Sequence, residues 1–219
     1  METTNLIAWL VAFGVISWAF LFFNNIWHIK KLKVVATKLG FSYSKSAKSR
    51  ELQHPDSRLF EVNTNTKQYL NVMSGEYRAT PCEIFEFSYR EHSSQHTNTV
   101  VQTIFVFESS KSFSFAECIH GDKINFFLLE TTPEELDIKL MVEEFDTNYG
   151  LQGKEIKNIK RWFRKVGAHT MLSTERASMA WQGKRCMFYV ARKQVPSTRI
   201  TEQLKQYHHA FIALETELP

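Results

Sequence analysis

The chain has 219 residues, of which 43% are hydrophobic and 23% charged, and its formal net charge is +4. This length accommodates one membrane segment with one domain of ordinary size, or with two small lobes. The mean hydropathy of −0.29 excludes a bundle of many membrane spans, because such a bundle needs an apolar excess along the whole chain.

An uncharged apolar run at the N-terminus predicts a membrane anchor. As a helix with a rise of about 1.5 Å per residue, residues 5–24 can cross a hydrocarbon core of about 30 Å. Trp9 and Trp27 can then lie at the two headgroup levels. A cleaved signal peptide would begin with basic residues, whereas this chain begins with Glu2 and no base. A buried core helix seldom stays uncharged over this length. We therefore expect residues 1–28 to anchor the chain in the bilayer.

Basic residues after the apolar run predict its direction. Seven of them precede Glu51, the first acid on that side: Lys30, Lys31, Lys33, Lys38, Lys45, Lys48 and Arg50. Because basic flanks resist translocation, we expect a single-pass protein of the cell membrane, inner or plasma. Its N-terminus would lie outside and its C-terminal domain in the cytoplasm.

A juxtamembrane helix is expected over residues 29–40, followed by a soluble domain over residues 41–219. Ile29, Leu32 and Leu39 keep helical spacing, and Gly40 suits a C-terminal cap. The lysines of this helix can lie against anionic lipid headgroups, at about 1 kcal/mol each, or can only set the topology. The two alternatives are compatible. These lysines are Lys30, Lys31, Lys33 and Lys38.

Alternating apolar residues predict an antiparallel meander in the first half of the domain. Its strands are expected at 41–43, 69–72, 82–90, 99–107, 113–119 and 123–129, with turns at 74–75 and 121–122. The segment 99–107 is apolar on both faces, which is typical of a central strand. Phe85, Phe87 and Tyr89 should share one face of their strand, with Glu86 and Ser88 on the other.

Helices dominate the second half of the expected fold. A helix start at 132–135 is followed by a short helix that ends before Tyr149. An apolar stripe predicts a second helix that ends near Gly167: Ile156, Ile159, Phe163 and Val166. A hairpin of strands 177–181 and 184–191 should turn at residues 182–183. The predicted fold class is α+β: an N-terminal transmembrane helix, a mainly antiparallel sheet and C-terminal helices packed on it.

The final helix, which residues 196–198 open, carries apolar residues spaced alternately four and three apart. They are Ile200, Leu204, Tyr207, Phe211, Leu214 and Leu218. This spacing is that of a coiled-coil seam, and a homodimer through this helix is one interpretation. The stripe covers fewer than three heptads, so packing on the sheet is the simpler interpretation.

Two short patterns resemble a group of uncharacterised prokaryotic membrane-anchored proteins. One is Leu39-Gly40-Phe41. The other is Phe145-x3-Tyr149-x-Leu151-x-Gly153-x-Glu155, with a later Phe163 and a strand ending Met187-Phe188-Tyr189. The resemblance covers roughly residues 30–215. It implies one or two N-terminal transmembrane helices and a cytoplasmic α+β domain, and it implies no activity or catalytic residue.

A basic helix face is the main candidate site. Five cationic residues fall three or four apart, opposite the apolar stripe: Lys157, Lys160, Arg161, Arg164 and Lys165. Residues 151–193 hold eleven basic and two acidic residues, whereas residues 108–150 hold ten acidic and three basic ones. Such asymmetry can attract an anionic partner. It can equally be a solvated face that balances the acidic segment within one domain.

Signatures of catalysis, metal binding and disulfides are absent from the sequence. The cysteines lie far apart at 82, 118 and 186, so we expect three reduced thiols, some of them buried. His92 and His96 fall in an expected loop, where their spacing fixes no metal geometry, and Cys118 with His120 lacks further ligands. There is no Gly-x-Ser-x-Gly elbow and no glycine-rich phosphate loop. We expect no cofactor and no metal.

The leading hypothesis from sequence is a non-enzymatic interaction or regulatory module with its basic face held near the membrane. Its partners would be anionic lipid headgroups or another membrane protein. The alternatives are a hydrolase-like membrane enzyme with a site built from distant residues, and a domain that binds anionic ligands or nucleic acid. Nucleic acid is disfavoured, because Trp162 and Trp181, which could stack on bases, are expected in the core.

Overall fold

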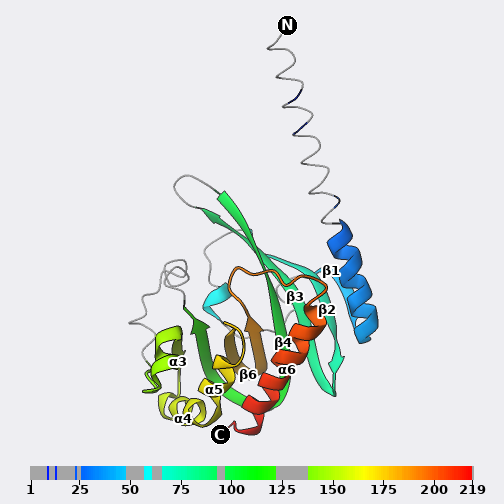
Figure 1. The fold of residues 1–219 in the computed structure, drawn as a ribbon. Helices are drawn as coiled ribbons and strands as arrows, with labels where there is room; N and C mark the ends of the chain where they lie inside the picture. The colour runs from blue at the N-terminus through cyan, green and yellow to red at the C-terminus, as the bar shows by residue number, and fades with distance from the viewer. Residues whose placement is uncertain are drawn as a thin grey trace.

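The structure, a computed structural model, describes residues 9, 13, 23, 26–47, 57–60, 66–92, 97–121 and 138–218. These residues form an α+β domain with a mainly antiparallel sheet and helices packed on it, which confirms the predicted class of the domain (Figure 1). The predicted span 5–24 lies outside the described residues apart from Trp9, Phe13 and Phe23. Within the part of the chain that the structure describes, no helix is both long enough and apolar enough to span a membrane.

Among the described residues, six strands form one sheet, and all of their pairings are antiparallel. The strands are β1 (Ser42–Ala47), β2 (Gln68–Tyr77), β3 (Thr80–His92), β4 (Thr97–His120), β5 (Tyr149–Gly153) and β6 (Ser178–Tyr189). β4 is central, as predicted for 99–107. It is long enough to pair first with β3 and then with β5 along one edge, while β6 pairs along the other edge.

Two predicted turns prove to be strand interior. β2 continues through Gly75 and turns at Arg78 and Ala79, whose φ angles of 52° and 63° suit a tight hairpin. Gly75 serves packing instead, because a Cβ there would lie 2.5 Å from the Phe41 ring. The hairpin predicted at residues 182–183 is also wrong, since Ser178–Tyr189 is one strand. Gly183, with φ of 57°, lies where the β4–β6 register shifts.

β4 likewise joins two predicted strands, 99–107 and 113–119, into one element. Residues 108–112, which neither predicted strand includes, belong to this strand, and its register against β6 shifts there. The strand predicted at 123–129, the turn at 121–122 beyond Gly121 and the helix start at 132–135 lie outside the described residues.

Besides the helix 26–39, which precedes β1, the described chain has short helices between its strands and a longer helix after the last strand. They are the 3-10 turn η1 (Arg58–Phe60), then α3 (Glu143–Asn148), α4 (Ile156–Trp162), the π-helical turn η3 (Phe163–Gly167), α5 (Ala168–Leu172) and α6 (Ile200–Thr216). The helix predicted to end near Gly167 continues to Leu172. A Cβ at Gly167 would lie 2.7 Å from the Phe163 ring, so this glycine permits close packing inside the helix rather than ending it.

The sheet buries a hydrophobic core on each of its faces. The larger core contains the apolar residues of α4, η3, α5 and α6, and Trp162 and Trp181 are buried in it. The smaller core, on the other face, gathers Phe85, Phe87 and Tyr89 with Leu59 of η1. All six seam residues of the final helix are buried within this chain, which agrees with packing on the sheet. That seam therefore offers no exposed stripe for a second copy.

The helix after the predicted anchor is part of the domain. Residues 26–39 are helical, and Gly40 has a φ of 72°, as expected for a C-terminal cap. Leu32 and Ala36 are buried in the larger core, and Val35 and Leu39 pack against it. Figure 1 shows this helix beside β1 and β2 at the edge of the sheet. The helix 26–39 consequently shares the larger core with the sheet and the C-terminal helices.

Candidate functional site

The predicted basic residues lie together on one solvent-facing surface. Lys157, Lys160 and Arg161 come from α4, and Arg164 and Lys165 come from η3. Together they line a shallow, open depression of about 540 Å³. We call these five residues the α4 basic surface. Helical spacing places their charges outward, because Ile159, Trp162 and Phe163 turn the opposite side of the helix into the core.

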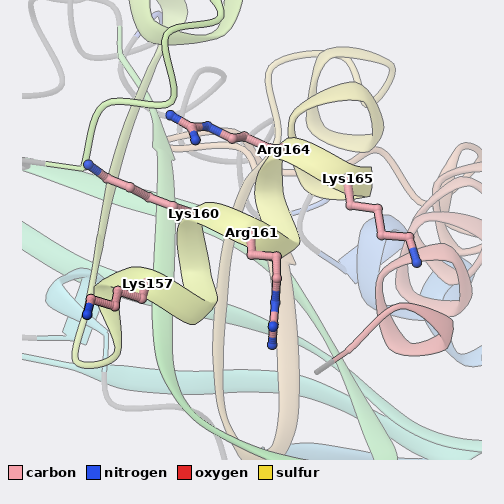
Figure 2. Close-up of a pocket in the computed structure, with 5 residues that line it drawn as sticks. All are labelled: Lys157, Lys160, Arg161, Arg164 and Lys165. Atoms are coloured by element: carbon pink, nitrogen blue, oxygen red, sulfur yellow. The ribbon is translucent and has the colours of Figure 1, made fainter.

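The side chains of the α4 basic surface spread apart. Figure 2 shows Lys157, Lys160 and Arg164 extending to one side, with Arg161 and Lys165 diverging from them. A fan of this kind fits an extended acidic surface better than one small anion, which needs donors that converge.

Three cations of this surface are available to a partner. Lys165 pairs with Glu217, and the Arg164 Nε donates to the Leu140 carbonyl at 3.1 Å. Within the described residues, the side chains of Lys157, Lys160 and Arg161 form no hydrogen bond or ion pair. Asp146, in the acidic segment, forms no ion pair with these three cations. Its carboxylate instead accepts backbone N–H groups of residues 140–142 at 2.8–3.3 Å.

Helix α6 separates the α4 basic surface from the helix 26–39. The start of α6 lies against that helix, while Trp162 of α4 donates from Nε1 to the Leu214 carbonyl near the end of α6, at 3.1 Å. A helix of 17 residues is about 25 Å long. Figure 1 shows α6 running from beside the helix 26–39 to the end of the domain that holds α4. The sequence could not predict this separation.

The juxtamembrane lysines divide between two places. Lys30, Lys31 and Lys38 line a groove of about 550 Å³ between the helix 26–39 and the start of α6. We call this cavity the juxtamembrane groove. It is lined by Trp27, Lys30, Lys31, Val34, Val35, Lys38, Ser197, Thr198 and Thr201. Lys33 points elsewhere, and its ammonium lies over the Tyr43 ring at 5.4 Å.

A buried carboxylate joins the helix 26–39 to the sheet, and sequence reasoning missed it. Glu86 of β3 is only 4% exposed. Its Oε1 lies 2.6 Å from His28 Nε2 and accepts from Gln194 Nε2 at 2.8 Å. Its Oε2 accepts from Asn71 Nδ2 at 2.6 Å, and Asn71 Oδ1 accepts the Tyr43 hydroxyl at 2.5 Å. The alternation of apolar and polar side chains along β3 was predicted correctly. The sequence did not predict that the helix 26–39 covers the polar face of this strand.

The pKa of the Glu86 carboxyl is lowered from its ordinary value. Burial, the largest influence, raises the pKa, but the hydrogen bonds with His28, Asn71 and Gln194 and the charge of His28 together outweigh it. Glu86 is therefore ionised near neutral pH. Its role is structural, and it cannot serve as a general acid there.

A second buried carboxylate, Glu117 of β4, lies on the other face of the sheet. It is 0% exposed, accepts a hydrogen bond from the Ser57 hydroxyl, and accepts another from Gln152 Nε2 at 2.5 Å. A charged residue inside an apolar stretch was the sequence signal that could have found it. These contacts hold η1 and β5 to the central strand, and they satisfy both carboxylate oxygens.

The cysteines are not placed for nucleophilic chemistry. All three are free, and all three are buried, whereas the sequence predicted burial for only some of them. Burial, with Glu83 adding to it, raises the pKa of the Cys82 thiol to about 12. Burial also raises the pKa of Cys118 and of Cys186 well above the ordinary value. Among the described residues, no three His, Cys, Asp or Glu side chains come together to hold a metal ion. The side chains of His92 and His96 lie outside that description.

The chain is similar to a solved structure, the crystal structure of the mycobacterial trehalose monomycolate transport factor A. The TM-score is 0.61 at 13% sequence identity, and the match covers 87% of this chain and 96% of that one. At this identity the likeness shows the shared fold alone. No protein-family model and no curated protein matches the sequence. The predicted membership of a membrane-anchored prokaryotic group stays a prediction.

Proposed function

We propose that this chain is a single-pass membrane protein whose cytoplasmic domain is a non-enzymatic interaction module. The observation that carries the proposal is a set of exposed aromatic side chains on helical residues, directly before the lysine-rich helix face. They are Trp9, Phe13, Phe23 and Trp27. Large exposed aromatic residues beside lysines are typical of a membrane and its interface. The N-terminus would lie outside and the domain inside.

The α4 basic surface is the docking surface that we assign to this module. Since it lies about one α6 length from the helix 26–39, it fits a partner held away from the bilayer, such as an acidic protein surface. This differs from the expectation of a basic face near the membrane. The lysines of the juxtamembrane groove take that position instead. The similar solved structure is named a transport factor, which is compatible with a non-enzymatic role.

Membrane anchoring has a direct test. We expect full-length chain in isolated membranes to resist extraction at alkaline pH, and a reporter active only outside the cytosol to stay silent at residue 219. A release of the chain by carbonate would contradict the anchor, and a strong C-terminal reporter signal would contradict its direction. The same reporter at the N-terminus is the positive control.

The docking surface is tested by charge reversal in the full-length chain, held in nanodiscs of neutral lipid. The variant Lys157→Glu, Lys160→Glu, Arg161→Glu changes the three cations that lack partners within the described residues. It should weaken binding of immobilised polyglutamate at least about tenfold, at 0.15 M salt or below, because screening is then incomplete.

The matched control is Lys45→Glu, Lys193→Glu, Lys205→Glu, which changes the net charge equally at exposed positions away from α4. It should weaken the binding only slightly. If both variants lose binding equally, net charge rather than the α4 basic surface attracts acidic partners, and the proposed docking surface is wrong.

A further inference from the structure

The juxtamembrane groove combines cations, hydroxyl groups and exposed apolar side chains. Trp27 is 61% exposed and Val34 is 54% exposed, although both line the groove. Lys30, Lys31 and Lys38 supply three ammonium groups, and no acidic residue is among the described residues that line the groove. A purely apolar ligand would leave the ammonium groups without a partner, and a purely charged ligand would leave the apolar side chains uncovered. The lining therefore suits a ligand that is both charged and apolar.

The opposite wall of the groove adds a second feature that favours an anion. It is formed by residues just before and inside the first turn of α6, including Thr198 and Thr201. The N-cap residue, Arg199, makes no side-chain capping hydrogen bond. The first-turn N–H groups of this helix therefore keep their partial positive charge toward that end. Glu202, the acidic residue of the same turn, is not among the residues that line the groove and pairs with Arg199 at 3.6 Å. The lysines across the groove reinforce this positive charge.

We propose that the juxtamembrane groove binds the headgroup of one anionic phospholipid from the surrounding bilayer. The phosphate would bind Lys31 and Lys38 and the hydroxyls of Thr198 and Thr201, while Trp27 contacts the glycerol and upper acyl region. This inference rests on the proposed membrane anchoring, and it deepens that proposal by naming a lipid class and a site.

A phospholipid fits the groove better than an acidic protein segment does. Trp27 lies three residues after the end of the apolar run, which ends at residue 24, so the groove would open at headgroup depth. A phospholipid carries its phosphate directly beside apolar chains, which matches lysines placed beside Trp27 and Val34. An acidic peptide would leave these apolar side chains without a counterpart.

The test measures lipid retained by the full-length chain. The chain is released from nanodiscs of equimolar phosphatidylglycerol and phosphatidylcholine, and native mass spectrometry counts the bound lipids. We expect the unmodified chain to retain more phosphatidylglycerol than phosphatidylcholine. Thr201→Glu should lower that preference about fivefold, because one charge near the surface has about the effect of one lysine. Glu is well tolerated in a first helical turn, so the fold should persist.

Two further variants sharpen this test. Thr99→Glu places the same charge on an exposed β4 position outside the groove and should leave the preference unchanged. Lys30→Gln, Lys31→Gln, Lys38→Gln should reduce it further than Thr201→Glu does, at about fivefold for each lysine.

The outcomes separate this inference from the proposed function. The lipid site is wrong if the chain enters nanodiscs but retains the two lipids equally. It is also wrong if the Thr201→Glu variant retains lipid like the unmodified chain. Neither result contradicts the proposed membrane anchor. A chain that does not enter nanodiscs contradicts both. If Thr201→Glu weakens only polyglutamate binding, the groove takes an acidic polypeptide, and the lipid assignment is wrong.

Discussion

Replacing Glu86 with alanine should lower the free energy of unfolding by about 3 kcal/mol, because the substitution leaves buried donors without their acceptor. Asn71 is buried and would lose its carboxylate partner, while His28 and Gln194 are more exposed and can recover water. Urea unfolding of the full-length chain in a mild detergent, followed by circular dichroism, measures the change.

The matched variant Glu86→Gln gives this prediction a pH signature. The folded-state pKa of Glu86 lies below its ordinary value of 4.5. Its ionised form therefore contributes stability that is fully present above about pH 4.5. That contribution is lost as the pH falls through the folded-state pKa. The stability difference between wild type and Glu86→Gln should accordingly shrink on acidification. A difference that stays constant down to pH 3 would show that the charge of Glu86 is not what stabilises this contact.

Replacing Trp162 with alanine should have the largest effect of any single substitution in the helical layer, about 3–5 kcal/mol. The indole is 1% exposed and contacts the rings of Phe113, Phe163 and Trp181 at centroid distances of 5.0–5.6 Å. Its Nε1 also donates to the carbonyl of Leu214, in the last turn of α6, where carbonyls lack partners within the helix. The same urea titration measures the loss.

Trp27→Ala is the control for this substitution, since the side chain is the same but most of it is exposed. We expect that variant to change the free energy of unfolding by less than about 0.5 kcal/mol. Trp162→Phe should cost about 1 to 2 kcal/mol, because packing survives while the hydrogen bond is lost. Equal losses for Trp162→Ala and Trp27→Ala would contradict the assignment of Trp162 to the core.

Local patterns predicted the parts of the fold that depend on neighbouring residues. Phe85, Phe87 and Tyr89 lie on one face because strand side chains alternate. The α4 basic surface was found because helical spacing gathers residues three and four apart. The cap at Gly40 followed from the conformational freedom of glycine.

The remaining features depend on contacts between residues far apart in the chain. The residues after Glu108, which neither predicted strand includes, continue β4. Ser109 Oγ and the Ser110 N–H both donate to Glu215 of α6, at 2.6 Å and 2.8 Å, and these bonds hold this part of the strand beside the helix end. Thr201 and Lys31 line the same groove only because α6 begins beside the helix 26–39. Periodicity describes one element at a time, so it could place neither contact.

A fragment of this protein that starts at residue 41 would therefore be a poor experimental substitute for the domain. It would lack Leu32 and Ala36 of the larger core and the His28 contact to Glu86. Fragments that begin before residue 26 keep all three.

The helix 26–39 has a mechanical consequence. Its apolar side is buried against the sheet, and His28 is bonded to Glu86. No loop between residues 26 and 40 can act as a hinge. A rotation or tilt of the helix 26–39 would therefore turn the whole sheet with it as one rigid body. The α4 basic surface, at the other end of α6, would move along an arc. Under the proposed anchoring, the orientation of the helix 26–39 at the bilayer would therefore also fix the position of the α4 basic surface.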